Sequence, residues 1–137
     1  MCKYECNTLY QSVVSYISFF LAIDFTWLGL VAKKFYDFHL SQFSRTLNWP
    51  AALFVYLLIV ASVVFISVTK YQQSGRLTDG FMWGAMAGLM MYGVYDLTNM
   101  ATLSNWSWKL VVVDVLWGVF VCGVVGLIAS NFSRVLT

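Results

Sequence analysis

Four long apolar runs, separated by short polar segments, dominate the chain. Each run can cross the roughly 30 Å hydrocarbon core of a bilayer as an α-helix. The runs predict transmembrane helices at residues 9–32, 50–69, 80–103 and 110–131. Because short segments join them, neighbouring helices are expected to run in opposite directions. The predicted fold is therefore all-α, a polytopic membrane protein with four transmembrane helices in an antiparallel bundle, forming one domain over residues 1–137.

The segments between the runs carry the expected boundary signals. Pro50 is placed for the first turn of a helix, and Gly75 lies in a polar turn. The first run is expected to be retained and not cleaved as a signal peptide, because no small-x-small site follows it. Residues 33–49 mix charged with aromatic side chains, which is typical of a loop lying at the membrane interface. A loop that gates access of a substrate is the alternative.

Small residues recur at every fourth position in the last two runs, so that each helix presents one narrow stripe. Glycines at such positions let two helices approach closely, and the short 104–109 link makes these two helices neighbours. One stripe consists of Gly80, Gly84, Gly88, Tyr92 and Asp96, and the other of Asp114, Gly118, Cys122, Gly126 and Ser130. Each stripe carries an acid, and the contact between the helices should bring the two acids to one end.

The composition supports a membrane protein and argues against a nucleic-acid-binding, disulfide-rich or metal-binding protein. The chain of 137 residues is 61% hydrophobic and only 10% charged, whereas soluble domains are about 25% charged. A net charge of +2 gives no reason to expect nucleic acid as a partner. Three cysteines and one histidine offer neither a disulfide framework nor a convincing metal site, since Cys2 and Cys6 are the only close pair. No cofactor is expected.

Three acids fall within the predicted spans, at a similar depth. Asp24 and Asp96 lie near the ends of their spans, and Asp114 lies near the beginning of the fourth. With alternating helix directions, all three would sit roughly 7–13 Å below the same membrane surface. A carboxylate among lipid tails costs about 3 kcal/mol or more, so such residues usually face a bundle interior or a wet cavity.

Other side chains complete a compact candidate site around these acids. Tyr92 and Asn99 share the helical face of Asp96, at i−4 and i+3. A tryptophan follows three residues after Asp in two spans, which places Trp27 and Trp117 beside the acids as walls of the site. The repeated Asp-x-x-Trp turn also raises the alternative of two related halves, although the halves do not align further.

The spans contain no lysine, arginine or histidine that could pair with these acids. The acids are therefore expected to be protonated, to share protons or to hold a bound cation. The alternative is a neutral, hydrogen-bonded cluster that only fixes the register of the helices. Orientation stays open, because each side of the membrane would carry four lysines and arginines.

Four strings of the chain form a distinctive set, namely Asp24-x-x-Trp27-Leu-Gly29-Leu, Lys34-Phe-Tyr36, Tyr92-Gly-Val-Tyr95-Asp96-Leu-Thr98-Asn99-x-Ala101-Thr102-Leu103 and Asp114-x-x-Trp117-Gly118. Together they resemble a family of predicted bacterial inner-membrane proteins, domain-of-unknown-function family 2177. The resemblance covers nearly the whole chain and implies a short four-helix, multi-pass protein of the bacterial inner membrane. It implies no reaction, substrate or catalytic residue.

Three functional hypotheses remain. The leading one is a small transport or conduction module in which the three acids bind protons or cations. The second is a membrane enzyme or binding protein acting on a lipid-like small molecule, and the third is an assembly subunit of a membrane complex. Membrane lipids are the expected surroundings. Because four short helices enclose little volume, the site could lie at a homodimer interface or in a shallow cavity of a monomer.

Overall fold

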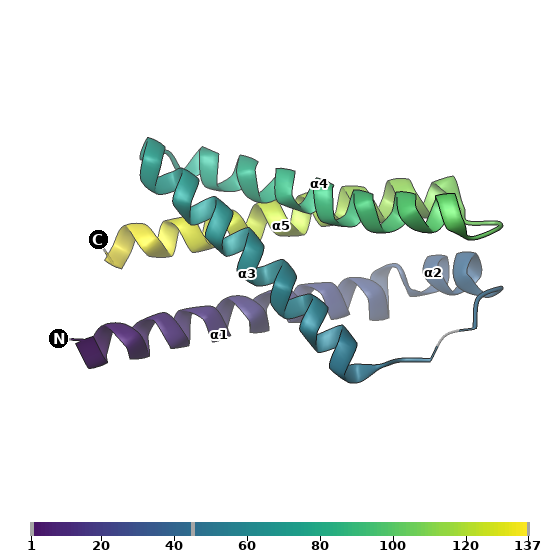
Figure 1. Cartoon of the computed structure of the whole chain (residues 1–137), viewed down its shortest axis with the longest axis horizontal. Helices are drawn as coiled ribbons and strands as arrows, with labels where there is room; N and C mark the ends of the chain where they lie inside the picture. The colour runs from purple at the N-terminus through teal and green to yellow at the C-terminus, as the bar shows by residue number, and fades with distance from the viewer. Residues whose placement is uncertain (1, 45, 137) are drawn as a thin grey trace.

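All regular structure in the described part of the chain is helical. The computed structural model describes residues 2–44 and 46–136, with side chains for residues 14–44 and 46–134. Figure 1 shows α3 crossing obliquely over the paired α4 and α5, with both termini towards the same end of the molecule. The elements are α1 (Cys2–Thr26), the π-helical turn η1 (Trp27–Val31), α2 (Lys33–Leu40), α3 (Trp49–Ser74), α4 (Leu77–Thr102) and α5 (Trp108–Leu136).

The boundaries of α3 follow from local chemistry. The Asn48 side chain accepts a hydrogen bond from the backbone N–H of Ala51 at 3.2 Å, and Pro50 occupies the first turn, as predicted. Gly75 ends the helix in the left-handed conformation, at φ 70°, and its N–H binds the Tyr71 carbonyl. The chain then reverses at once into α4, so that α3 and α4 meet at this turn.

Two predicted boundaries were wrong. The first helix begins at Cys2, whereas the sequence analysis placed its beginning at residue 9. The side chains of Cys2 and Cys6 lie outside the described residues. The predicted loop 33–49 contains the helix α2. Its apolar side chains pack against the rest of the protein, which makes a helix more stable there than an irregular interfacial chain.

Three helices are long and apolar enough to cross a membrane. These candidate spans are Val14–Val31, Trp49–Ser74 and Trp108–Arg134. Within the described residues α4 is not among them, although it has 26 residues. The buried residues of α4 are four glycines, Ala87 and Asp96, none of which adds a large apolar side chain.

The contact between α4 and α5 is built on glycine, as the two small-residue stripes predict. A Cβ atom at Gly84 would lie 2.6 Å from the Cys122 carbonyl oxygen, and one at Gly88 would overlap the Gly118 carbonyl. Only glycine at these positions permits so close an approach of two helix backbones. Ser67 of α3 sits over the same contact, against Gly84 and Gly126, and ties the third helix to the pair.

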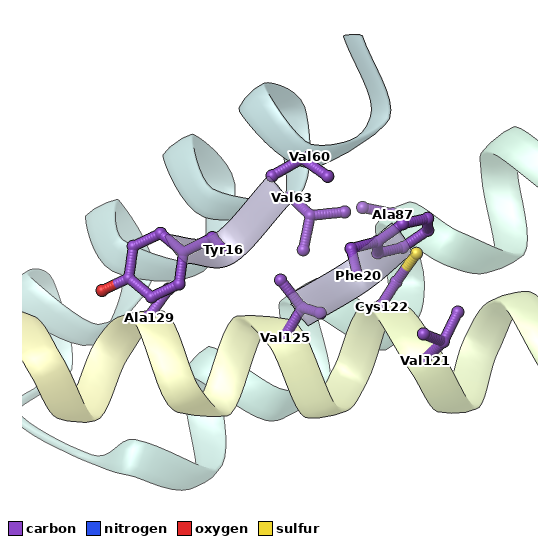
Figure 2. Close-up of a cluster of buried hydrophobic side chains, with 9 residues drawn as sticks. All are labelled: Tyr16, Phe20, Val60, Val63, Ala87, Val121, Cys122, Val125 and Ala129. Carbon is purple, nitrogen blue, oxygen red and sulfur yellow. The ribbon is translucent and has the colours of Figure 1, made fainter. Parts of the chain in front are cut away.

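The hydrophobic core lies where α1 meets this three-helix unit (Figure 2). Phe20 of α1 is fully buried against aliphatic side chains of α3 and α5, and Tyr16 lies one turn away. The other members of the cluster are Val60, Val63, Ala87, Val121, Cys122, Val125 and Ala129. The core therefore fixes the position of α1, and with it that of Asp24.

Helix α2 docks onto α5 through Tyr36. Its ring belongs to a small buried cluster with Ala32 and Leu110, and its hydroxyl donates a hydrogen bond to Oδ1 of Asp114. Burial raises the pKa of Tyr36 well above its ordinary value, and the hydrogen bond to Asp114 and its charge act in the same direction. Tyr36 therefore remains a proton donor throughout the physiological range.

Replacing Gly88 by alanine is expected to destabilise the protein by about 1–3 kcal/mol, because the added methyl group overlaps the Gly118 carbonyl. Gly93→Ala is the matched control on the same helix, since nothing lies within 4 Å of its Cβ position. There alanine should be neutral or stabilising by up to about 1 kcal/mol. Unfolding of purified protein in detergent measures both; equal losses would contradict the glycine contact.

The Tyr36 hydroxyl should make stability depend on pH at the alkaline end. An unfolded tyrosine ionises near pH ~10, whereas folded Tyr36 keeps its proton, so stability is complete below that pH and falls as the pH rises above it. Tyr36→Phe should lose about 1 kcal/mol at neutral pH and show a shallower alkaline decline. Tyr71→Phe, beside the α3–α4 turn, is the control; a decline unchanged by Tyr36→Phe would refute the assignment.

Candidate functional site

A cavity of about 740 Å³ opens between the beginning of α3, the end of α4, and the helices α1, α2 and α5. All three acids singled out in the sequence line it. Most of the remaining wall is aliphatic, including Leu28, Val55, Ile59, Met91 and Leu110. The cavity thus combines an apolar wall with a small set of convergent polar groups, which is the general character of sites for small molecules.

Asp24 is held in a complete hydrogen-bond arrangement. Its side chain is 3% exposed, and each carboxyl oxygen accepts one bond from another helix. The Tyr56 hydroxyl of α3 donates to Oδ2 at 2.5 Å, and the Trp117 indole N–H of α5 donates to Oδ1 at 2.8 Å. Since charge-assisted hydrogen bonds are the strong ones, this carboxyl joins α1, α3 and α5 at one point.

The two Asp-x-x-Trp turns meet face to face. The rings of Trp27 and Trp117 stack with centroids 4.3 Å apart and an interplanar angle of 5°. Asp114 receives its hydrogen bond from Tyr36, as Asp24 does from Tyr56. Two acids from two similar turns are therefore each bound by a tyrosine from a different element. The likeness is confined to these turns and gives no evidence of related halves.

The π-helical turn after Asp24 adapts the chain to this arrangement. The N–H of Ala32 binds the carbonyl of Trp27, five residues earlier, at 2.8 Å. A π turn contains one residue more than an α turn, and such turns are frequent at functional sites. The π turn ends at Ala32, and α2 begins at the next residue. The change of direction places Tyr36 of α2 at the cavity.

Asp96 differs from the other two acids. It is fully buried and lines the cavity, yet neither carboxyl oxygen has a hydrogen-bond partner among the described residues. The Asp114 carboxyl and the Trp106 indole lie close to it, and the indole N–H is also without a partner there. Two carboxylates can only repel each other, whereas one proton held between them would form a hydrogen bond.

No cation of the described part of the chain neutralises this group of acids. Lys33 lines the cavity, but its ammonium pairs with Asp37 at 2.7 Å, and both side chains are about half exposed or more. A metal ion finds no site either, because the described residues contain no group of three histidine, cysteine or acidic side chains that could hold one. The acids therefore leave the cavity with an excess of negative charge whenever they ionise.

The other predicted site residues fall into two groups. Tyr92 lines the cavity, and its ring packs against Gly118. Trp27 and Trp117 stack on each other, and the indole N–H of Trp117 donates a hydrogen bond to Asp24. Asn99 does not line the cavity; its amide lies next to the Tyr95 hydroxyl, because Asp96 and Asn99 diverge around the helix.

Three side chains at the site were missed by the sequence analysis, namely Tyr36, Tyr56 and Trp106. Tyr56 carried a signal, because it is one of few polar side chains within the apolar run 50–69. Tyr36 and Trp106 lie in segments predicted to be loops, where an aromatic side chain is equally expected to anchor at the interface. Only the folding of α2 back onto α5 shows their role.

Comparison with known proteins agrees with the resemblance noted in the sequence. Neither a search of curated proteins nor one of solved structures gives a match. A family model described as "Predicted membrane protein (DUF2177)" matches residues 9–131, which is most of the chain. Together with the three apolar helices, this match identifies a membrane protein. The chain belongs to the DUF2177 family of predicted membrane proteins.

Proposed function

We propose that this protein is a small transport module of the bacterial inner membrane, in which Asp96 and Asp114 hold an exchangeable proton. In this proposal α4 crosses the bilayer with the three more apolar helices, giving a multi-pass, antiparallel four-helix protein. The tight glycine contact with α5 supports this placement, because it keeps the polar face of α4 away from lipid. One chain lines the whole cavity, so a homodimer is not required.

The observation that carries the proposal is that the buried Asp96 carboxyl has no hydrogen-bond partner among the described residues. A buried carboxyl with no hydrogen bond is costly, and structures retain such groups chiefly where they act. A purely structural cluster would satisfy every member, as it does at Asp24. Asp96 instead faces a cavity with room for a ligand. A proton on Asp96 can bond to Asp114, and its departure leaves a charge that attracts a cation.

In this proposal the other two acids, Asp24 and Asp114, have different roles. Asp24 is fixed by Tyr56 and Trp117 and keeps the helices in place while Asp96 changes its protonation. Asp114 is held by a hydrogen bond from Tyr36, and its carboxyl lies close to that of Asp96. Ion or proton coupling by acids within a membrane follows the same physical logic in pumps and carriers generally.

Asp96→Asn is expected to lower proton flux across liposomes under an imposed pH gradient by at least about tenfold, towards the level of empty liposomes. The amide has nearly the same shape as the acid but cannot release a proton. The internal dye signal of reconstituted, folded protein measures this flux. Infrared titration of the same samples should show a protonated carboxyl band that the variant lacks.

Asp79→Asn is the matched control, because Asp79 lies on the same helix but outside the cavity, paired with Arg76 at 3.1 Å. Its flux and its infrared band should equal those of the wild type. A folded Asp96→Asn protein with unchanged flux and an unchanged carboxyl band would refute the proposal and return the acids to a structural role.

A further inference from the structure

The size and lining of the cavity indicate more than a site for a proton. We propose that its ligand is a lipophilic organic cation, a molecule with one positive charge on an apolar body, which enters from the bilayer and binds at Asp96. This inference rests on the proposed function, because it assigns the ligand of the same site. The description of the family, a predicted membrane protein, gives no ligand.

The cavity is much larger than a bare ion. Sites for small organic molecules measure about 300–1,000 Å³, and the cavity lies within that range at about 740 Å³. Its wall is mainly aliphatic, so a hydrated inorganic ion would face surface that cannot replace its water. An apolar body against Ile59, Met91 and Leu110 gains free energy from the same surface.

The polar end of the cavity determines the charge of the ligand. Asp24, Asp96 and Asp114 converge there, and the only described cation in the lining, Lys33, is already paired with Asp37. A fatty acid or another anionic amphipath would be repelled by these acids. A single positive charge is matched to Asp96, which is the one acid of the three that has no hydrogen bond from the side chains the structure describes.

Aromatic side chains line the same cavity as this acid and favour a diffuse cation over a compact one. Tyr92 and Tyr95 lie one turn and one residue before Asp96 on α4, and Trp106 lies beside it. The faces of such rings attract organic cations, which lose less hydration than small ions when they leave water. The Trp106 N–H can donate to Asp96 once that carboxyl is ionised.

The divergence of α3 from α4 provides a route from the lipid. The two helices touch at Ser67 and Gly84, near their shared turn, and separate towards the beginning of α3 (Figure 1). Rim residues on both helices are exposed, with Val55 at 52% and Tyr95 at 60%. Small side chains, Ala51 and Ala52, line the α3 wall of the opening. A ligand dissolved in the bilayer can therefore enter sideways.

Binding is an exchange that balances in charge. The proton shared by Asp96 and Asp114 leaves as the cation arrives, so the site holds one positive charge in either state. No bond of the ligand is made or broken. The exchange predicts that one proton is released for each cation bound, and that a higher proton concentration weakens binding. Tyr36, Tyr56, Tyr92 and Tyr95 face the site but are not needed as proton donors to solvent.

The test uses two probes of the same shape and opposite charge, tetraphenylphosphonium and tetraphenylborate. Wild-type protein in lipid nanodiscs should bind tetraphenylphosphonium saturably above the level of empty nanodiscs and release about one proton per cation. Tetraphenylborate should bind no better than to empty nanodiscs. Asp96→Asn should weaken tetraphenylphosphonium binding at least about tenfold, and Asp79→Asn should not change it.

A second pair of variants tests the cavity without altering an acid. Ala52→Phe fills the wall of the opening and should abolish saturable binding, while its infrared carboxyl band remains. Ala61→Phe, on the exposed face of the same helix and outside the cavity, should bind as the wild type does. This pair keeps the inference testable even if Asp96→Asn fails to fold.

The outcomes separate the ligand from the proton site. Equal binding of the two probes, or binding unaffected by both Asp96→Asn and Ala52→Phe, overturns the inference. If tetraphenylphosphonium fails to bind while the Asp96 carboxyl band and flux persist, the ligand class is wrong but the proposed function stands. If Asp96→Asn leaves the carboxyl band, the proton flux and cation binding all unchanged, the proton site is refuted as well.

Discussion

The close packing of α4 on α5 is the constraint on which the rest of the structure depends. Backbone atoms of the two helices meet at Gly84 and Gly88, where any larger residue would hold them apart. That approach brings Asp96 beside Asp114 and buries Asp96 fully. Ser67 of α3 lies against the same contact, at Gly84 and Gly126. The remaining helices are placed relative to this unit.

The three acids of the cavity differ because of their neighbours and not because of their depth. Asp24 accepts bonds from two helices and acts as a joint between them. Asp114 accepts one bond from Tyr36 and lies close to Asp96. Asp96 accepts none among the described residues, although it is fully buried. The proposed proton exchange rests on this difference between a fixed acid, a partly fixed acid and an acid without a hydrogen bond.

Helix α2 couples this site to the edge of the membrane region. The π-helical turn lets the chain leave α1 just after Trp27, and the short helix then folds back onto Leu110. Tyr36 therefore reaches Asp114 from outside the candidate span Val14–Val31, and the Lys33–Asp37 pair lies at the same end. In this way a segment with an ordinary interfacial composition becomes part of the wall of the cavity.

The sequence by itself determined the helical class, the membrane environment, the glycine contact and the gathering of Asp24, Asp96 and Asp114 towards one end. These features depend on periodicity and hydropathy, which are local properties of the chain. Tertiary structure alone decided which acid is left without a hydrogen bond, since that depends on Tyr36, Tyr56 and Trp117 arriving from other segments. It also decided that α3 diverges from α4 and opens a cavity. Side-chain contacts between distant segments leave no periodic trace in a single sequence, so only the folded chain reveals them.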